Sequence, residues 1–219
     1  MKFPSRKVWR STLTVVGVLL WGGCVVVPEE DVVKDPDYFP LEIGNIWAYA
    51  SFDQNGRQLD EPVTYRVVST SRSGDTVIYY RELSFRTSFQ EAFYKDETGV
   101  YTVGNTGELL ERRVAYPVVL DEEWDFAQPR IVRDSSGRET ASYRRRARVV
   151  AKENVTLFKG HKFENALKVH YITEGPSRPA EVVRWYAPEV GVVREVRLFV
   201  PNTVTELTEY SLVAKKGGK

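Results

Sequence analysis

Cysteine is nearly absent from this chain, since Cys24 is the only one among its 219 residues. One cysteine excludes an internal disulfide and every metal or redox motif that needs a cysteine pair. Histidine is almost as rare, with only His161 and His170. On a shared strand these two would face opposite sides of the sheet, because their separation is odd. A zinc site needs three or four convergent ligands, so we predict solvent-facing histidines, no metal site and no cofactor.

Sequence motifs of enzymes are missing as well. The chain has no G-x-S-x-G or S-x-x-K nucleophile motif and no glycine-rich phosphate loop. The stretch Asp121–Asp125 is acidic enough to suggest a carboxylate or calcium site. Carboxylates that cleave a sugar must flank it about 5 to 9 Å apart, and neighbouring loop residues do not establish this, so we interpret the stretch as a solvated acidic loop. The sequence therefore predicts a protein that is not an enzyme; a hydrolase built from dispersed residues is the alternative.

Long hydrophobic runs are missing, with one short exception near the N-terminus. The stretch Leu13–Leu20 is mostly apolar, but it is shorter than the roughly 20 residues that a membrane-spanning helix needs. The segment before it contains no acid and four basic residues, which are Lys2, Arg6, Lys7 and Arg10. A basic segment followed by a short apolar run is typical of an export signal.

Two small residues, Gly22 and Gly23, stand directly before Cys24. This arrangement resembles the lipobox of bacterial lipoproteins, in which the cysteine receives a diacylglyceryl group and becomes the new N-terminus. Trp21 departs from the aliphatic residue that is usual at its position. The resemblance implies that residues 1–23 are a cleaved signal peptide and that Cys24 is the lipidation site, with acyl chains such as palmitate.

Lipidation of Cys24 would decide where the protein is found. Two acyl chains on one cysteine anchor a protein stably, whereas a single chain gives only marginal binding. We therefore predict a membrane partner and a location in the bacterial cell envelope, at the outer membrane if the host has two membranes. Two alternatives stay open: Cys24 is a buried free thiol, or Val25–Val27 extends the apolar run into an uncleaved anchor.

The charge balance gives no reason to expect nucleic acid as a partner. The full chain has 31 basic and 30 acidic residues. Without the four basic residues of the predicted signal, 27 basic residues stand against 30 acidic ones, a net charge of about −3. Nucleic-acid binding calls for a clustered positive surface on a basic domain, so we predict no such partner.

The mature chain divides into three parts. Residues 24–37 contain two prolines and five acids but little to bury, which predicts a flexible tether. Residues 38–213 form one predicted domain, without an internal repeat. Hydrophobic residues make up 42% of the chain and charged residues 28%, values close to ordinary globular usage. Residues 214–219 are a predicted disordered tail.

Alternation of apolar and polar residues dominates the predicted domain. The stretch Ile46–Phe52 is the first predicted strand, and Asn55-Gly56 after it favours a hairpin turn. The clearest strand is Glu139–Leu157, whose odd positions are mostly apolar or small and whose even positions are mostly polar. One-sided alternation is typical of antiparallel sheet. Ten to thirteen such strands are too many for one flat sheet, so we predict an all-β fold with little helix: a strongly curved antiparallel sheet or half-open barrel.

The polar face of that long strand is basic. It contains Arg144, Arg146 and Arg148, which we regard as a candidate surface for anionic lipid headgroups, lipopolysaccharide or an acidic partner, at about 1 kcal/mol per residue near a membrane. The alternative is a solvated ladder of cross-strand ion pairs, with carboxylates such as Glu111, Glu139 and Glu164.

Aromatic residues gather in the first half of the domain, at Tyr79, Tyr80, Phe85, Phe89, Phe93, Tyr94 and Tyr101. One interpretation is that they line a concave apolar surface. Core packing is the other, because half-buried strands use these residues in any case.

Three segments carry a family resemblance. They are Tyr38–Tyr49 (YFPLEIGNIWAY), Phe163–Val169 (FENALKV) and Trp185–Val193 (WYAPEVGVV). They resemble motifs of a broad group of uncharacterised bacterial lipoproteins of the DUF3108 and TapB-like type, across nearly the whole domain. The resemblance implies an antiparallel sheet curled into a half-barrel, and it implies no activity. Pro188-Glu189 stands where a glycine is often found.

Within these motifs we predict structural roles for five residues. A turn that suits positive φ is predicted at Gly44 and Asn45, after which Trp47 enters the strand as a large core anchor. Gly191 belongs to the hairpin near the C-terminus. Trp185 is predicted to pack against Trp47 from the other end of the domain.

The leading functional hypothesis is a non-enzymatic envelope lipoprotein that binds an apolar or amphipathic ligand on the concave face of its sheet. The alternative is a structural or assembly factor that docks on another envelope protein through a sheet edge or the arginine-rich face. A ligand carrier requires a continuous apolar cavity. An interaction module requires a filled interior and an exposed patch.

Overall fold

The computed structural model describes residues 35–85, 87–176, 179–198 and 203–214. The predicted signal peptide, Cys24 and most of the predicted tether and tail lie outside these residues. Among the described residues, no helix has the length and hydropathy needed to cross a membrane.

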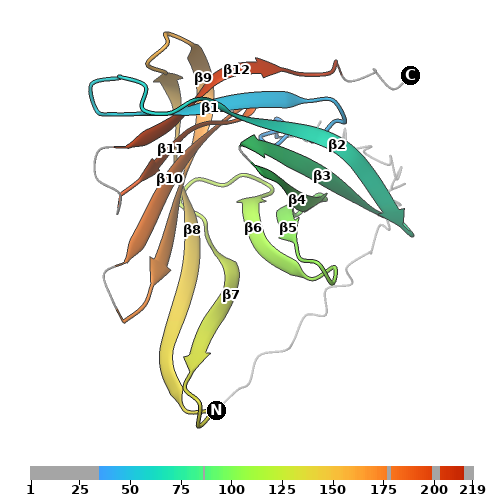
Figure 1. The fold of residues 1–219 in the computed structure, drawn as a ribbon, viewed down its shortest axis with the longest axis vertical. Coiled ribbons are helices and arrows are strands. Elements are labelled where there is room, and N and C mark those ends of the chain that lie inside the picture. Colours follow the sequence, from blue (N-terminus) through green and yellow to red (C-terminus); the bar gives the residue numbers. More distant parts are fainter. Residues whose placement is uncertain (1–34, 86, 177–178, 199–202, 215–219) are drawn as a thin grey trace, which may run out of the picture. The chain divides into compact units, whose positions relative to one another are not determined.

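The described chain forms twelve antiparallel strands (Figure 1). They are β1 (Ile46–Phe52), β2 (Val63–Ser73), β3 (Thr76–Phe85), β4 (Thr87–Lys95), β5 (Gly99–Val103), β6 (Leu109–Ala115), β7 (Glu123–Arg133), β8 (Glu139–Thr156), β9 (Lys162–Glu174), β10 (Ala180–Ala187), β11 (Gly191–Arg197) and β12 (Val204–Ser211). Each strand pairs with its neighbours in chain order, and β1 pairs with β12. The all-β prediction is confirmed, and the curved sheet closes into a barrel.

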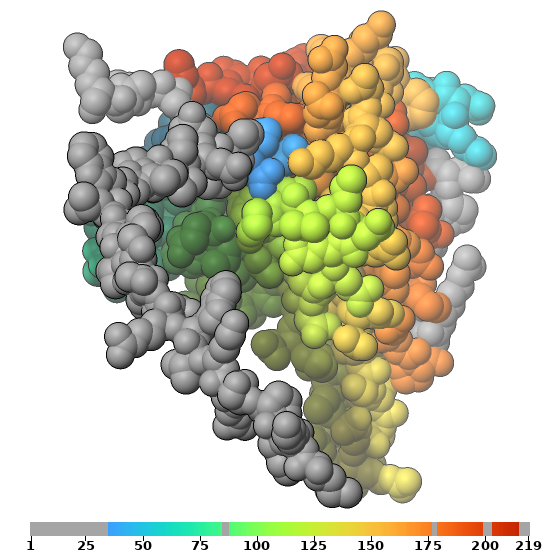
Figure 2. All heavy atoms as spheres, turned by 180° about the vertical axis from the view of Figure 1, so that it is seen from behind, coloured from blue at the N-terminus to red at the C-terminus, as the bar shows by residue number. Residues whose placement is uncertain are grey.

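Among the neighbouring strands of the barrel, β6 and β7 are joined by the fewest residue pairs. A single residue pair, Glu111 with Ala127, joins these two strands. Beyond it β7 and β8 continue as a long hairpin, which extends past the rest of the barrel in Figures 1 and 2. We call the β6–β7 junction the seam. Other edges are also incompletely paired, because β1 pairs only with residues 63–66 of β2 and β5 only with residues 92–95 of β4. Docking through a sheet edge therefore stays a prediction.

Strand β7 was not among the predicted strands. Its pairing with β8 shifts register between Asp125 and Ala127 and again between Ala127 and Arg130, and each shift breaks the period-2 pattern. Pro129 also lacks the N–H that a strand interior normally uses. The predicted acidic loop therefore runs into a strand.

One end of the barrel is closed by the segment before β1, which we call the plug (Asp35–Asn45). Its side chains Tyr38, Phe39 and Leu41 are 1%, 7% and 4% exposed. The Tyr38 N–H donates to the Tyr116 hydroxyl, and Lys95 forms an ion pair with Asp37. Asp35 and Asp37, which belong to the predicted tether, therefore contact the barrel.

Part of the core lies where the far end of the β8–β9 hairpin covers β10–β12. Trp185 is 9% exposed and donates from Nε1 to Glu153 on β8 at 2.7 Å. Its neighbours Arg184 and Tyr186 line the barrel interior, so Trp185 faces outward, because strand side chains alternate. Trp47 instead donates to the carbonyl of Val190 at 2.7 Å. Both indoles belong to the same set of buried hydrophobic residues, although their N–H groups bond to different partners. The packing of Trp185 against Trp47 stays a prediction.

Candidate functional site: the barrel interior

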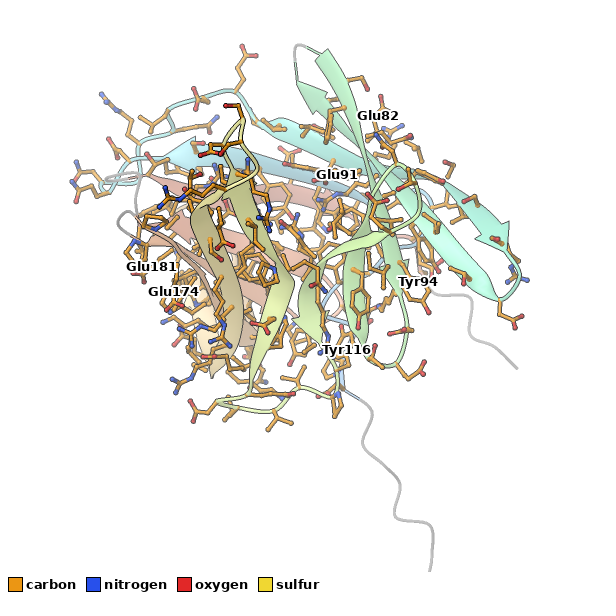
Figure 3. The ribbon with its side chains drawn as sticks, turned by 90° about the horizontal axis from the view of Figure 1, so that it is seen from below. Glu82, Glu91, Tyr94, Tyr116, Glu174 and Glu181 are labelled. Carbon is orange, nitrogen blue, oxygen red and sulfur yellow. The ribbon has the colours of Figure 1, made fainter. Side chains whose placement is uncertain are left out.

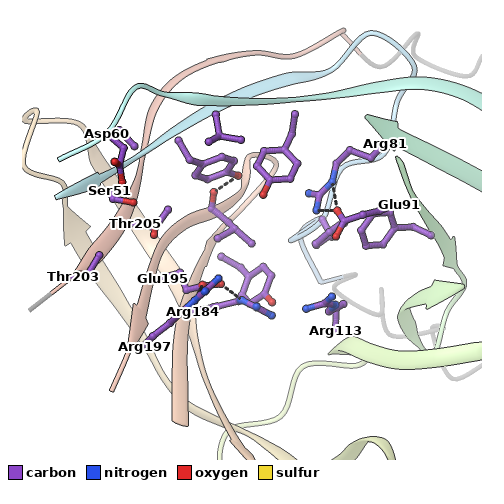
Figure 4. Close-up of a pocket in the computed structure, with 18 of the residues that line it drawn as sticks. Ser51, Asp60, Arg81, Glu91, Arg113, Arg184, Glu195, Arg197, Thr203 and Thr205 are labelled. Atoms are coloured by element: carbon purple, nitrogen blue, oxygen red, sulfur yellow. Dashed lines mark hydrogen bonds and ion pairs between the residues drawn. The ribbon is translucent and has the colours of Figure 1, made fainter. Parts of the chain in front are cut away.

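The barrel encloses a cavity of about 610 Å³ (Figure 4). This volume lies in the range of about 300–1,000 Å³ that small-molecule sites occupy. Phe39 of the plug and strands β1–β4, β10 and β11 contribute to its lining. Figure 3 shows Glu91 among the side chains on the β4 side of the interior, whereas Glu174 and Glu181 lie on the opposite wall. The charged residues of the lining include Arg81, Glu91, Arg113, Arg184, Glu195 and Arg197.

Two arginine–glutamate pairs line the cavity. Arg81 and Glu91 are directly opposite each other on β3 and β4, with 2.5 Å between Nη2 and Oε2. Arg184 and Glu195 are opposite each other on β10 and β11, with 2.6 Å between Nε and Oε2. All four side chains are largely buried. Buried charges of this kind are tolerated because each has an oppositely charged partner.

Aromatic rings hold the two cavity guanidinium groups in place. The Arg81 guanidinium lies 4.5 Å from the ring centre of Tyr65 and 4.8 Å from that of Phe93. The Arg184 guanidinium lies 5.0 Å from the ring centre of Tyr171. Stacking of this kind is attractive, and more so away from water. The cavity therefore presents positive groups whose orientation is set before any ligand arrives.

Buried tyrosine hydroxyls complete the wall. Tyr49 donates to the carbonyl of Val192 at 2.8 Å, and the hydroxyls of Tyr171 and Tyr186 are 2.6 Å apart. Burial raises the pKa of Tyr49 and Tyr171 well above the ordinary value. Both phenols therefore stay neutral at physiological pH and serve as hydrogen-bonding groups rather than as nucleophiles.

The Arg184–Glu195 pair makes the fold sensitive to acid. Burial alone would raise the pKa of Glu195, but the charge and hydrogen bonds of Arg184, with Arg197, lower it below its ordinary value. A carboxyl whose folded pKa is lowered contributes stability above its unfolded pKa of about 4.3 and loses that contribution as the pH falls through the folded pKa. We expect Glu195→Gln to lower the free energy of unfolding by about 3 kcal/mol at pH 7, with a difference from wild type that narrows below about pH 4. Urea unfolding of both proteins from pH 3 to 7 measures the difference in stability, and Glu122→Gln, at an exposed position, is the control. A difference that does not change with pH would contradict the prediction.

A second hollow, of about 1060 Å³, adjoins the seam. It shares Glu91 and Arg113 with the cavity. Its lining adds the charged residues Glu111 and Arg145 and the partly exposed Leu109. The two hollows therefore share part of their walls, so that lining residues extend from the plug to the seam. Arg113 lies where the two hollows meet.

The predicted arginine surface and the predicted acidic loop are partners of each other. The three arginines lie on the outer face of β8, and each forms an ion pair with an acid of the other stretch: Arg144 with Asp125, Arg146 with Glu123, and Arg148 with Asp121. Glu174 on β9 is a second partner of Arg146. The row is thus balanced in charge, and its use as a binding surface stays a prediction without support from this geometry.

Sequence reasoning missed the charged residues of the interior. Arg145 belongs to the same basic run as Arg144 and Arg146, but it lies on the other face of β8, 3.6 Å from Glu111 on β6. Arg81 and Arg184 stood out in no motif. The one sequence feature that could have indicated them is their position on the same strand face as aromatic residues. However, a reader who assumes an apolar interior interprets a charged residue at an inward position as a sign that the strand has been placed in the wrong register.

The predicted turn residues take the conformations that their positions require. Gly44 and Gly191 both have a φ of 98°, a value that side chains rarely adopt. Asn45 is 1% exposed, and its side-chain oxygen accepts from the N–H of Val213. Glu189, at the place where the related motif often has glycine, has a φ of 59°. The departure from the motif is therefore accommodated in the same left-handed backbone region.

The two histidines differ in exposure. His161 is exposed in the turn after β8, whereas His170 is partly buried with its Nε2 2.8 Å from Glu181. The prediction of a solvent-facing residue therefore fits His161 better. Across the described ranges, no group of three His, Cys, Asp or Glu residues has the geometry to hold a metal ion.

Two solved structures share this fold. One is described as an exported protein with a YmcC-like fold from Bacteroides fragilis; it is 14% identical, with a TM-score of 0.53 over 81% of this chain and 100% of that chain. The other is described as a lipoprotein from Parabacteroides distasonis; it is 16% identical, with a TM-score of 0.51 over 80% of this chain and 99% of that chain. No protein-family model matches the chain, and no curated protein is similar to it in sequence. At this level of identity the similarity establishes the fold alone.

Proposed function

We propose that this protein is a lipid-anchored component of the bacterial cell envelope that binds a small amphipathic ligand inside its barrel and catalyses no reaction. The observation that carries the proposal is the cavity of about 610 Å³, lined by buried ion pairs and aromatic rings. Concave sites with a few oriented polar groups are the usual places for small ligands.

The location rests on the N-terminal sequence. A basic segment, a short apolar run and two glycines precede Cys24, and this order resembles a lipoprotein signal. The two proteins of the same fold, described as exported and as a lipoprotein, support an envelope location for this chain as well. The membrane is therefore the proposed partner, through acyl chains on Cys24.

The cavity lining supports an amphipathic ligand rather than a purely apolar one. Rings such as Phe93 and Tyr65 alternate with the charged pairs, so the continuous apolar surface expected of a carrier for apolar molecules is not what lines this site. A ligand with both a polar and an apolar part would satisfy both kinds of group, since unpaired buried polar atoms are costly.

The non-catalytic part of the proposal rests on the absence of nucleophile motifs from the sequence and on the state of the cavity groups. The carboxylates Glu91 and Glu195 are held by arginines, and the pKa of the buried phenol of Tyr49 is raised by burial. A general base needs a pKa near the working pH and a free approach to its substrate. These groups suit binding better than proton transfer.

We expect a small molecule to accompany the protein when it is extracted from its native membrane in mild detergent. Denaturation followed by mass spectrometry identifies what is released. Val63 lines the cavity, so Val63→Trp should fill the space and reduce the released amount about tenfold. Val150→Trp, at a partly exposed position on β8, is the matched control and should release as much as wild type. Equal release from both variants, or none from wild type, would exclude a ligand in this cavity.

A further inference from the structure

We infer that the ligand bears one anionic group, a carboxylate or a phosphate, and that this group binds Arg113 where the cavity meets the second hollow. The inference rests on the proposed function and names the chemical class of its ligand. It is carried by the balance of charge inside the barrel, by an unpaired donor atom, and by the position of Arg113.

The guanidinium groups that line the two hollows outnumber their glutamate partners. Arg81 pairs with Glu91, whereas Arg184 shares Glu195 with the more exposed Arg197. Arg113 and Arg145 share one, Glu111, at 2.9 Å and 3.6 Å. The further acids that line the two hollows, Asp60, Glu61 and Glu108, are exposed in loops. One positive charge at the seam is therefore left without a buried counterpart, which is costly unless an anion supplies it.

Arg113 also has a donor that nothing in the protein uses. Its Nε is buried and has no hydrogen-bond partner, although buried donors in folded proteins are nearly always paired. Two other arginines of the described chain share this feature, Arg112 and Arg146, but neither lines a hollow. Figure 4 shows the Arg113 side chain within the cavity and apart from the two dashed ion pairs.

The surroundings of Arg113 suit an anion with an apolar body. A guanidinium presents parallel N–H groups that match the two oxygens of a carboxylate or phosphate. The rings of Phe39, Phe93 and Tyr186 line the same cavity, where an apolar or flat body can pack against them. Ligand charge and ligand body are thus recognised by different residues, and each can be tested alone.

The test uses two fluorescent probes with the same ring system, anilinonaphthalene sulfonate and the uncharged phenylnaphthylamine. Wild type should bind the sulfonate at least about tenfold more tightly, because a charge-assisted hydrogen bond in a buried site contributes about that factor. Arg113→Met should remove this preference and leave the affinity for the uncharged probe within about twofold. Arg144→Met, on the outer face of β8, should change neither. Competition by dodecanoate, dodecyl phosphate and dodecanol then shows which anionic group is preferred.

Arg113→Lys separates a loss of binding from a folding defect. Lysine keeps the positive charge but lacks the paired N–H groups of a guanidinium, so Arg113→Lys should bind the sulfonate more tightly than Arg113→Met does. Circular dichroism should show that the two variants are equally stable. Equal affinity of wild type for the charged and uncharged probes would overturn the anion site and leave the proposed ligand cavity standing. If wild type binds neither probe and releases no native ligand, both proposals fall together.

Discussion

Replacement of Cys24 by serine is expected to move the protein from the membrane fraction to the soluble fraction. Serine offers no thiol for the diacylglyceryl group, and the described domain has no helix able to span a membrane. Two acyl chains make anchoring stable, so the change should be close to complete rather than graded. Fractionation with immunodetection measures it, and mass spectrometry of the N-terminal peptide should show acyl mass on Cys24 in wild type alone.

Trp21→Leu is the matched variant, because it restores the aliphatic residue usual in the lipobox. We expect it to be processed at least as fast as wild type and to remain in the membrane. Cys24→Ser that stays in the membrane would favour the uncleaved anchor, in which Val25–Val27 prolongs the apolar run. Wild type recovered from the cytosol with Met1 still in place would contradict the whole envelope assignment.

Trp47→Ala is expected to lower the free energy of unfolding by about 4 kcal/mol, which is the usual cost of deleting a buried large aromatic side chain. Trp47 is 4% exposed and its Nε1 donates to the carbonyl of Val190. The indole thereby ties β1 to the turn between β10 and β11, next to Gly191 and the plug residue Pro40. A loss of this size is a large part of the roughly 5–15 kcal/mol that stabilises a typical domain. Urea unfolding followed by circular dichroism measures it without relying on tryptophan fluorescence.

Two further variants separate the contributions of Trp47. Trp47→Phe keeps most of the volume and loses the hydrogen bond, so about half of the effect should remain. Tyr210→Ala removes an aromatic residue that is 45% exposed and should cost about 1 kcal/mol or less. Equal losses for Trp47→Ala and Tyr210→Ala would show that the plug end does not depend on the indole.

The charged interior bears on function as well as on stability. Replacing a buried ion pair by well-packed apolar residues is often neutral or stabilising, so the pairs Arg81–Glu91 and Arg184–Glu195 are not what a barrel needs in order to fold. Their position next to a cavity is consistent with a binding role. The strongest expectation falls on Arg113, because it shares its only carboxylate partner in the described chain with Arg145 and lines both hollows.

Much of the fold could be predicted from the sequence, because the alternation of apolar and polar residues in a strand depends only on neighbouring residues. The predicted strand Ile46–Phe52 agrees with β1 to the residue, and the turn at Asn55-Gly56 has a φ of 78° at its glycine. The long alternation predicted a strand over Glu139–Leu157, and β8 begins at the same residue and ends one residue earlier, at Thr156. Strand β7 was not predicted, because register shifts and Pro129 interrupt its alternation of apolar and polar residues.

The candidate site was harder to predict. Strands are recognised in a sequence by assuming that inward-facing residues are apolar, and inward-facing arginines do not fit that assumption. The outer row of Arg144, Arg146 and Arg148 stood out in sequence, and the structure neutralises it with carboxylates of the preceding stretch. Arg113 and Arg145, which share Glu111 inside the barrel, were not predicted as a site. The pairs of the outer row and the Arg145–Glu111 pair do not follow from spacing along the chain, since their partners are far apart in sequence, whereas Arg113 and Glu111 are two residues apart on β6.

Local sequence patterns were enough to predict strands and tight turns and to suggest an export signal before Cys24, because each depends on residues that are close together in the chain. The closure of the sheet, the position of the plug at one end and the charges that line the interior are visible only in the folded arrangement. The physical reason is that closure brings together side chains from strands far apart in sequence, and burial and pairing of charge are properties of that assembly.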